Sequence, residues 1–299
     1  METPEEGAWG MKMHFLNIDQ LSEQQILGIF DAADQLKRNR NSSILSSRTF
    51  VLFFPESSIR TRLTFEKGIK DLGGDSILFP PETLDKRESL EDVMQYIQNW
   101  GDGVIVRHAD FNKMKELAEQ ATIPVINAMS SVNHPCEIIS DLYRISRMRS
   151  DYRKLVYTFV GPAGNICNSW RHIAQAMDLN FNHACVEGER LSLDNLNYRF
   201  HTELEAVLEN SDIVLTDSLP APFRTRAYID RYQITLDRMK LANEGALLNP
   251  CPPFFRNEEV SDDAINSDYF AGHAFKRDLI HVQQAILLAC LGINNPSGD

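Results

Sequence analysis

The sequence of 299 residues lacks the closely spaced cysteine and histidine pairs that hold metals or redox centres. Its five cysteines are scattered, and the two closest, Cys167 and Cys185, stand 18 positions apart. Its eight histidines show neither HxxxH nor HExxH spacing. Structural zinc sites and redox motifs need ligands a few residues apart. We therefore expect no metal site, and we expect the cysteines to be reduced and buried.

Long apolar runs and an excess of positive charge are also lacking. The longest apolar run, AILLACLGI near the C-terminal end, is far shorter than the roughly 20 residues that a membrane span requires. The opening METPEEGAWG is acidic where a signal peptide is basic. Lys and Arg number 30 against 42 Asp and Glu, and a net charge of −12 repels polyphosphates and anionic membranes. We expect a cytoplasmic protein that binds neither nucleic acid nor membrane.

Short, continuously apolar runs alternate with stretches of helical spacing along the whole chain. The runs are 49–54, 75–79, 103–107 and 124–127, followed by 155–161, 181–186, 212–217 and 245–249. Unbroken hydrophobicity is typical of strands that are covered on both faces, as in parallel sheets. The alternation therefore predicts two doubly wound α/β domains. The polar stretch 147–154 (RMRSDYRK) separates them, which gives a first domain at 1–147 and a second at 148–299.

Unusual polar residues follow several of these runs, at the strand ends where open parallel sheets bind ligands. The first run leads into a helical segment that begins with Ser57, Ser58 and Arg60. Hydroxyls, backbone N–H groups and arginines at a helix start suit a dianionic phosphate, although a capping serine with solvated arginines is the alternative. The other strand ends carry Arg107, His134-Pro135-Cys136-Glu137, Asn165, Asp217-Ser218 and Asn249-Pro250-Cys251-Pro252.

Together these segments resemble the motifs of the aspartate and ornithine carbamoyltransferases. Ser58-Ile59-Arg60-Thr61-Arg62 is similar to their Ser-x-Arg-Thr-Arg motif for carbamoyl phosphate. Lys86-Arg87-Glu88-Ser89-Leu90 is similar to their mobile loop, and His134-Pro135-Cys136-Glu137 to their His-Pro-x-Gln. The order and spacing hold from about residue 14 to residue 292.

The resemblance implies an architecture and an assembly. The phosphate-binding domain comes first, and a C-terminal helix at about 277–291 packs back on it. The protein is expected to be a homotrimer or a multiple of trimers with active sites between subunits. Lys86 would then reach into the site of the neighbouring subunit, the alternative being a solvated loop charge.

The resemblance also implies the chemistry. Ser58, Arg60, Thr61 and the backbone N–H of Ile59 would hold the phosphate, while Arg107 and His134 donate to the carbamoyl oxygen. Arg60, Arg107 and His134 are thus the predicted catalytic residues. No cofactor is expected, because the departing phosphate can accept the proton of the amine. Glu137 stands where the family has a glutamine that accepts from the carbamoyl NH2.

The acceptor amine is predicted from the second domain. Asn165 and Asp217 match the ornithine enzymes, whereas aspartate enzymes carry arginines at both positions. Ser218, Pro250 and Cys251 complete the predicted acceptor site. However, the Ser-Met-Gly loop of the ornithine enzymes is replaced by 219–223 (LPAPF), and Asn249-Pro250-Cys251-Pro252 is nearer to the His-Pro-x-Pro of the aspartate enzymes.

We therefore predict a carbamoyltransferase that acts on ornithine or a related diamino acid. Three alternatives stay open at this point. One is an aspartate-type or other amine acceptor, and another is a non-catalytic regulatory subunit of this family. The third is a nucleotide-binding oxidoreductase, which the incomplete glycine pattern at Gly161 and Gly164 disfavours.

Overall fold

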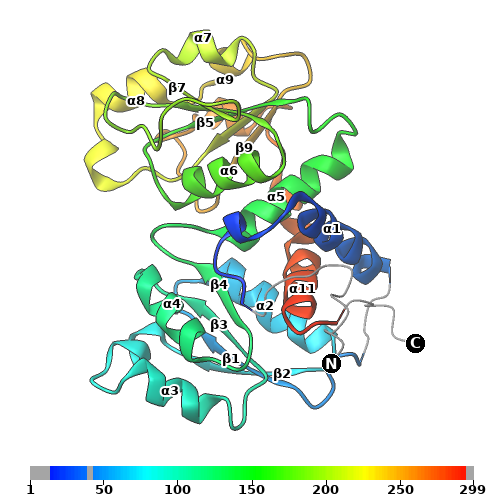
Figure 1. The fold of residues 1–299 in the computed structure, drawn as a ribbon. Helices are drawn as coiled ribbons and strands as arrows, with labels where there is room; N and C mark the ends of the chain where they lie inside the picture. The colour runs from blue at the N-terminus through cyan, green and yellow to red at the C-terminus, as the bar shows by residue number, and fades with distance from the viewer. Residues whose placement is uncertain (1–13, 39–42, 294–299) are drawn as a thin grey trace. The chain divides into compact units, whose positions relative to one another are not determined.

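The computed structural model describes residues 14–38 and 43–293, and these form two compact units (Figure 1). The described residues up to Arg144, together with those from Lys276 onward, make up the first unit. Residues 145–275 make up the second, so the division falls inside helix α5 (Pro135–Met148).

The first unit is built on a four-stranded parallel sheet in the order β2-β1-β3-β4. Its strands are β1 (Thr49–Phe53), β2 (Asp75–Phe79), β3 (Gly103–Arg107) and β4 (Val125–Met129). Its helices are α1 (Glu23–Arg38), α2 (Ile59–Asp71), α3 (Leu90–Ile97), α4 (Phe111–Gln120), the first part of α5, and α11 (Leu279–Cys290). Short 3-10 turns cover Ile18–Gln20 and Pro81–Asp85, and the turn His273–Asp278 contains the second division between the units, at Lys276.

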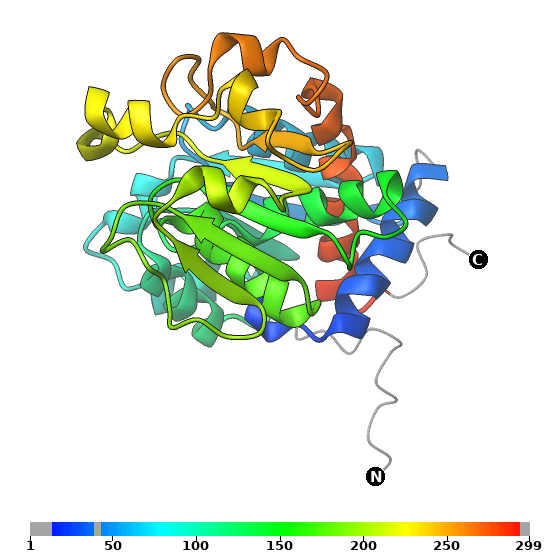
Figure 2. The same ribbon diagram turned by 90° about the horizontal axis from the view of Figure 1, so that it is seen from above.

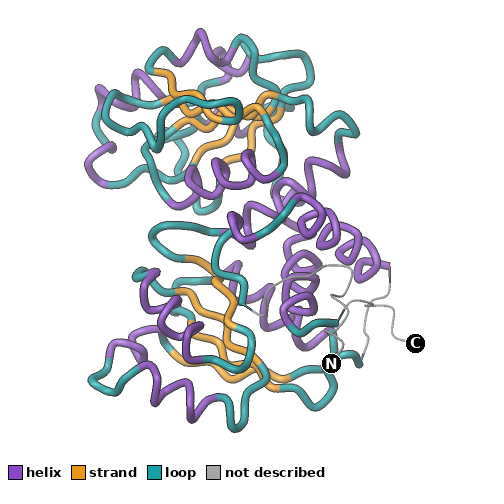
Figure 3. The backbone as a smooth tube through the Cα atoms, viewed as in Figure 1, coloured by secondary structure: helices purple, strands orange, loops and turns teal. Residues whose placement is uncertain are grey.

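Helices cover both faces of this sheet, which is why its inner strands are apolar throughout (Figure 3). On one face Val51 and Val104 pack against Met94 of α3 and Met114 of α4. Side chains alternate between the two faces along each strand, so Phe50, which is fully buried, lies on the opposite face from Val51. The doubly wound arrangement predicted from the apolar runs is confirmed.

The C-terminal helix α11 returns to the first unit, as predicted, and lies beside α1 and α2 (Figures 1 and 2). The amide of Gln284 donates to the carbonyl oxygen of Gly68 on α2 over 2.8 Å. A Cβ atom at Gly68 would lie 3.2 Å from Cγ of Gln284, a tight contact that the glycine avoids. Buried Asp278, just before α11, pairs with Lys37 of α1 at 2.8 Å and with Arg144 of α5 at 3.3 Å.

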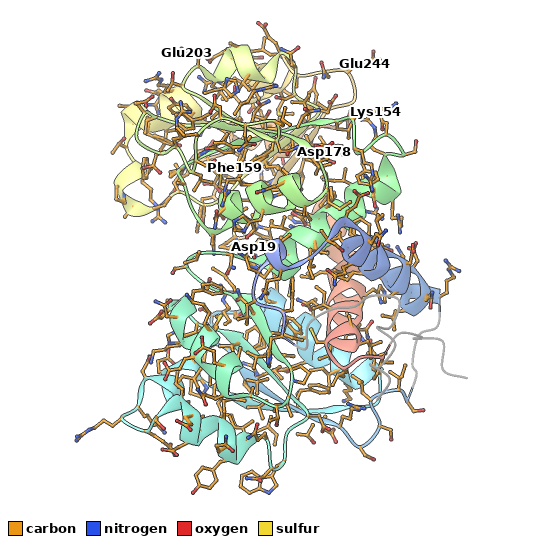
Figure 4. All side chains as sticks on the ribbon, in the orientation of Figure 1. Asp19, Lys154, Phe159, Asp178, Glu203 and Glu244 are labelled. Carbon is orange, nitrogen blue, oxygen red and sulfur yellow. The ribbon has the colours of Figure 1, made fainter. Side chains whose placement is uncertain are left out.

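The second unit holds a five-stranded parallel sheet in the order β7-β6-β5-β8-β9. Its strands are β5 (Val156–Val160), β6 (Asn180–Ala184), β7 (Tyr198–His201), β8 (Ile213–Thr216) and β9 (Leu247–Pro250). Its helices are α6 (Asn165–Ala176), α7 (Leu204–Leu208), α8 (Arg226–Tyr232), α9 (Leu236–Met239) and α10 (Asp262–Ile265), with a 3-10 turn at Ala221–Phe223. Phe159 is buried in this unit, whereas Lys154, Glu203 and Glu244 lie on its exposed rim (Figure 4).

All eight predicted strands are present, within one to two residues at most ends, but β7 was missed. Tyr198–His201 lies at the edge of the sheet, and its residues alternate between buried and partly exposed positions. A four-residue alternating segment lacks the unbroken apolar run that identified the inner strands. Within residues 14–38 and 43–293, no helix is long and apolar enough to cross a membrane.

Candidate active site

The loop after β1 places Ser58 and Thr61 at the buried start of helix α2. Ser58 is 2% exposed and Thr61 is 4% exposed, whereas Ile59 and Arg60 face solvent. Ser58 is the N-cap residue, yet its hydroxyl makes no capping bond to the helix. The side chain therefore has another partner. The backbone N–H of Ile59 donates to the Ser57 carbonyl oxygen over 3.0 Å. The other N–H groups of the first turn lack an acceptor within the helix, as at any helix start, and such groups can bind an anion.

That partner is Arg107, whose Nη1 donates to Ser58 Oγ over 3.0 Å. Arg107 ends β3, and the pairing of β3 with β4 shifts register between Val106 and Arg107. Such a bulge turns the strand end and redirects its side chain. The structure thus brings Ser58 and Arg107 together, although 49 positions separate them in the sequence.

A buried amide network fixes the loop between β4 and His134. Asn127 donates to Asn133 Oδ1 over 2.6 Å, and Ser130 Oγ donates to the same oxygen over 2.7 Å. Asn133 in turn donates to the carbonyl oxygen of Leu16. These buried hydrogen bonds tie the loop to β4 and to Leu16, and His134 directly precedes the first residue of α5.

His134 is 6% exposed, and burial lowers its pKa to about 4. The negative charge of Glu137 raises this pKa, and the positive charges of Arg107 and Lys276 lower it. The net result is a neutral imidazole at pH 7, which can still donate one N–H.

Glu137 is bound by a lysine that the sequence analysis did not identify. The Nζ atom of Lys276 lies 2.7 Å from Glu137 Oε1 and 2.6 Å from Asp141 Oδ1. Glu137 and Asp141 are one helical turn apart on α5 and are 5% and 2% exposed. Two buried carboxylates on one helix face require a cation, and this was the signal available in the sequence.

The predicted mobile loop lies in the first unit, beside Arg107. Lys86 directly follows the 3-10 turn Pro81–Asp85 and is exposed, with no hydrogen-bond or ion-pair partner among the described residues. The preceding Asp85 is tied to the sheet edge by His108 at 3.1 Å and Lys113 at 3.0 Å. A cavity of about 490 Å³ is lined by Pro55, Pro81, Asp85, Arg107, His108 and neighbouring residues.

In the second unit, the predicted acceptor residues gather at the carboxyl ends of three adjacent strands. Asn165 begins α6 after β5, and Asp217 and Ser218 follow β8, the neighbour of β5. Pro250 ends β9, where it pairs with Thr216, and the backbone N–H of Cys251 donates to the Thr216 carbonyl oxygen over 2.8 Å. These residues share one sheet edge, as the strand order requires.

The turn between Gly161 and Gly164 does not favour a dinucleotide. Its exposed backbone N–H at Ala163 is already bonded to the Glu189 carboxylate over 2.8 Å. A pyrophosphate would need such N–H groups and would be repelled by this carboxylate. All five cysteines are buried and none forms a disulfide. In the part of the chain that the structure describes, no cluster of three His, Cys, Asp or Glu residues could hold a metal ion.

Comparison with known proteins gives matches along nearly the whole chain. The sequence model described as "Aspartate/ornithine carbamoyltransferase, carbamoyl-P binding domain" matches residues 13–147. The model described as "Aspartate/ornithine carbamoyltransferase, Asp/Orn binding domain" matches residues 153–290. The chain is 29% identical to the ornithine carbamoyltransferase of Methylobacillus flagellatus, with 92% of this chain and 95% of that protein covered.

A second relative and a solved structure agree. The ornithine carbamoyltransferase of Nitrobacter winogradskyi is 26% identical, over 93% of this chain and 97% of its own length. The crystal structure of ornithine carbamoyltransferase from Burkholderia thailandensis superimposes with a TM-score of 0.87 at 26% identity, covering 95% of this chain and 100% of that one. The fold is therefore shared along both units.

Proposed function

The chain belongs to the aspartate/ornithine carbamoyltransferase family, and from this premise we propose that it carbamoylates ornithine or a closely related diamino acid. It is a carbamoyltransferase enzyme, and carbamoyl phosphate is the donor that the family uses. In this proposal residues 1–147 bind carbamoyl phosphate and residues 148–299 bind the acceptor amino acid. The protein is proposed to act in the cytoplasm.

The hydrogen bond from Arg107 to Ser58 is the observation that carries the donor half of the proposal. It couples the helix start that would hold the phosphate to the guanidinium that would polarise the carbamoyl group. Arg60 and Thr61 would complete the phosphate site, since a helix N-terminus with a cation suits a dianion. The N–H of Ile59 would join them only by giving up its 3.0 Å bond to the Ser57 carbonyl oxygen. The Ser58 hydroxyl is already held in place by Arg107 and is therefore preorganised for binding the phosphate.

Arg107 and His134 would stabilise the transition state. Attack by an amine on the carbamoyl carbon places negative charge on the carbamoyl oxygen, and donors aimed at that oxygen lower the barrier. His134 suits this role because its lowered pKa keeps the imidazole neutral and non-repelling toward the attacking amine. The C–O bond to phosphate then breaks, and the phosphate can take the proton lost by the amine.

The acceptor half of the proposal rests on charge. Asn165 is neutral and Asp217 is acidic, so this sheet edge attracts an ammonium group and not a second carboxylate. A diamino acid offers such an ammonium group in addition to the amine that reacts. Aspartate would bring its extra carboxylate next to Asp217.

A homotrimer is part of the proposal, supported by apolar residues on the surface of the first unit. Edge strand β2 is exposed along most of its length, with Ile77 50% and Phe79 40% exposed. Ile59 and Leu63 of α2 are 70% and 60% exposed. Apolar side chains at a sheet edge are normally covered, and a second copy of the chain would cover them. Sedimentation of the purified chain tests the trimer directly.

The function is tested by incubating the protein with carbamoyl phosphate and a panel of amines. The panel holds ornithine, shorter and longer diamino acids, putrescine and aspartate, and products are identified by mass. We expect one carbamoylated diamino acid, and we expect Arg60→Ala to abolish its formation in a folded protein. Lys67→Ala, on the same helix but paired with Asp71, is the control that should retain turnover. Absence of any product, or product from aspartate alone, would contradict the proposal.

A further inference from the structure

Two buried carboxylates share one ammonium group at the start of helix α5. Glu137 and Asp141 lie one turn apart, and Lys276 Nζ contacts both, at 2.7 Å and 2.6 Å. Lys276 is itself largely buried, with 17% of its side chain exposed. It reaches α5 from the 3-10 turn His273–Asp278, which leads into α11. The pair Lys276–Asp141 alone would be neutral, so Glu137 adds one negative charge to this cluster.

Glu137 is ionised because of its neighbours and in spite of its burial. Burial alone raises the pKa of its carboxyl group, but Lys276, His134 and Arg60 lower it below the ordinary value. Lys276 is the largest of these favourable influences. Without its ammonium group, Glu137 would stand beside Asp141 with both carboxylates at least 95% buried. A buried carboxylate without a cation takes up a proton or turns away.

The ionised state decides what Glu137 can do for a substrate. A glutamine presents one acceptor oxygen and one NH2 donor, whereas an ionised carboxylate presents acceptors only. A carboxylate that accepts from an amide N–H forms a charge-assisted bond, which is stronger than a neutral one. Its negative charge also repels a dianionic phosphate unless a cation lies beside it.

We propose that Lys276 is a positioning residue that holds Glu137 ionised and oriented to accept from the amide N–H of the carbamoyl group. The pair Glu137–Lys276 then replaces the neutral glutamine that the family uses at this position. This inference rests on the proposed function, since it assumes that the first unit binds carbamoyl phosphate. Lys276 acts through Glu137 and does not need to touch the substrate.

The test uses two stable phosphonates that differ only in the group that faces Glu137. Phosphonoacetamide carries an amide NH2, and acetonylphosphonate carries a methyl group in its place. Their ratio of dissociation constants is measured by calorimetry and requires neither the acceptor nor turnover. The ketone oxygen is a weaker acceptor than the amide oxygen in every variant, so the change of the ratio between variants reports the contact of the amide N–H with residue 137. We expect the wild-type chain to bind the amide at least about tenfold more tightly. In Lys276→Met this preference should fall to about twofold or less.

Rescue separates positioning from simple structural support. In the double variant Glu137→Gln with Lys276→Met, the neutral amide no longer needs a cation, and the tenfold preference should return. If Lys276 merely supports Asp141 and the fold, the double variant would stay as deficient as Lys276→Met. Lys37→Met is the matched control, since it removes a cation from another buried carboxylate, Asp278, and should leave the preference unchanged.

Each result of these experiments has one meaning. A wild-type chain that binds neither phosphonate overturns the proposed function. If the wild-type chain binds both phosphonates equally well, the role of Glu137 is overturned, whereas the proposed function is not. If Lys276→Met keeps the full preference for the amide, the role of Lys276 is overturned. If Lys276→Met does not fold, Asp141→Asn takes its place. It leaves the ammonium wholly to Glu137, so the preference should persist or rise, and its loss would overturn the proposal.

Discussion

Arg107 Nη1 donates to Ser58 Oγ over 3.0 Å, and this bond joins the end of β3 to the start of α2. The two residues come from adjacent strands, since β1 pairs with β3 in the sheet. The bond orients a guanidinium that the sequence places at the strand end, and a guanidinium carries five N–H donors in a fixed plane. Ser58 therefore has two proposed roles, as a phosphate ligand and as the group that orients Arg107.

This relationship predicts unequal effects of two substitutions on turnover. Arg107→Met removes a donor to the carbamoyl oxygen and should lower kcat by about a hundredfold or more. Ser58→Ala leaves the guanidinium in place without its anchor and should lower kcat by roughly tenfold. Steady-state kinetics with the acceptor found in the panel measures both. Thr64→Ala removes a hydroxyl bonded within the same helix and should retain kcat. A Ser58→Ala enzyme as slow as Arg107→Met would contradict this order.

The buried histidines predict how stability depends on pH. Burial lowers the pKa of His134 and of His183 to about 4, against an ordinary value of 6.5. Between these values the unfolded chain binds protons that the folded chain does not. The free energy of unfolding is therefore highest above about pH 6.5 and falls as the pH drops toward 4. Each histidine contributes roughly 3 kcal/mol to this loss.

Urea unfolding at several pH values between 7 and 4.5 measures this dependence. His134→Asn removes one of the two groups, so the slope of unfolding free energy against pH should decrease by up to one proton. His183 keeps its contribution in that variant, through a ring that bonds Gly161 and Tyr198 in the second unit. An unchanged slope in His134→Asn would show that His134 titrates normally in the folded protein.

Asp217 is predicted to set the affinity for the acceptor. It follows β8 at the sheet edge shared with Asn165, and its Oδ1 accepts from the backbone N–H of Ser218 over 2.8 Å. That bond orients the carboxylate, whose negative charge would attract an ammonium group. Asp217→Asn should raise the KM for the diamino acid about 10- to 100-fold, because a charged hydrogen bond is lost.

The KM for carbamoyl phosphate should stay within about twofold in Asp217→Asn, because the phosphate residues belong to the first unit. Asp230→Asn is the matched control on the second unit. This carboxylate is exposed and paired with Arg226 on α8, and its loss should change neither constant. A raised KM for carbamoyl phosphate with an unchanged KM for the acceptor would contradict the proposed role of Asp217.

The apolar runs were sufficient to predict eight of the nine described strands, because strands covered on both faces are mostly apolar. The same criterion missed β7, since its four residues alternate between buried and partly exposed positions and form no apolar run. Strand ends were equally predictable, and this placed Arg107, Asn165 and Asp217 on the correct sheet edges. The direction of each side chain could not be predicted. The bulge at Arg107, for example, arises from the pairing of β3 with β4 and has no local sequence pattern.

Lys276 shows a second limit of the sequence. It lies 139 positions after Glu137, and only the return of α11 to the first unit brings the two within 2.7 Å. Local spacing carries no information about such a contact. The need for a cation was visible in the acid pair Glu137 and Asp141, but the identity of that cation depended on the tertiary fold.

Lys86 provides the last prediction, which concerns active sites shared between subunits. Its side chain is exposed and lies next to Asp85, which His108 and Lys113 hold at the sheet edge. In the proposed trimer Lys86 contributes to the active site of the neighbouring subunit, while Arg60 contributes to the active site of its own subunit. Lys86→Met and Arg60→Ala should therefore each be inactive alone. When the two variants are mixed, dissociated and reassembled, some sites receive Arg60 from one chain and Lys86 from the other.

Random reassembly at equal amounts places both intact residues in about a quarter of the sites, so activity should recover to about a quarter of the wild-type value. The control is a mixture of Lys86→Met with a chain that carries both substitutions. Every chain there lacks Lys86, so no intact site can form and activity should stay absent. Mixing without dissociation should also restore nothing, because subunits do not exchange. If Lys86 served the site of its own chain, the mixed trimers would stay as inactive as their parents, since no single chain would carry both residues.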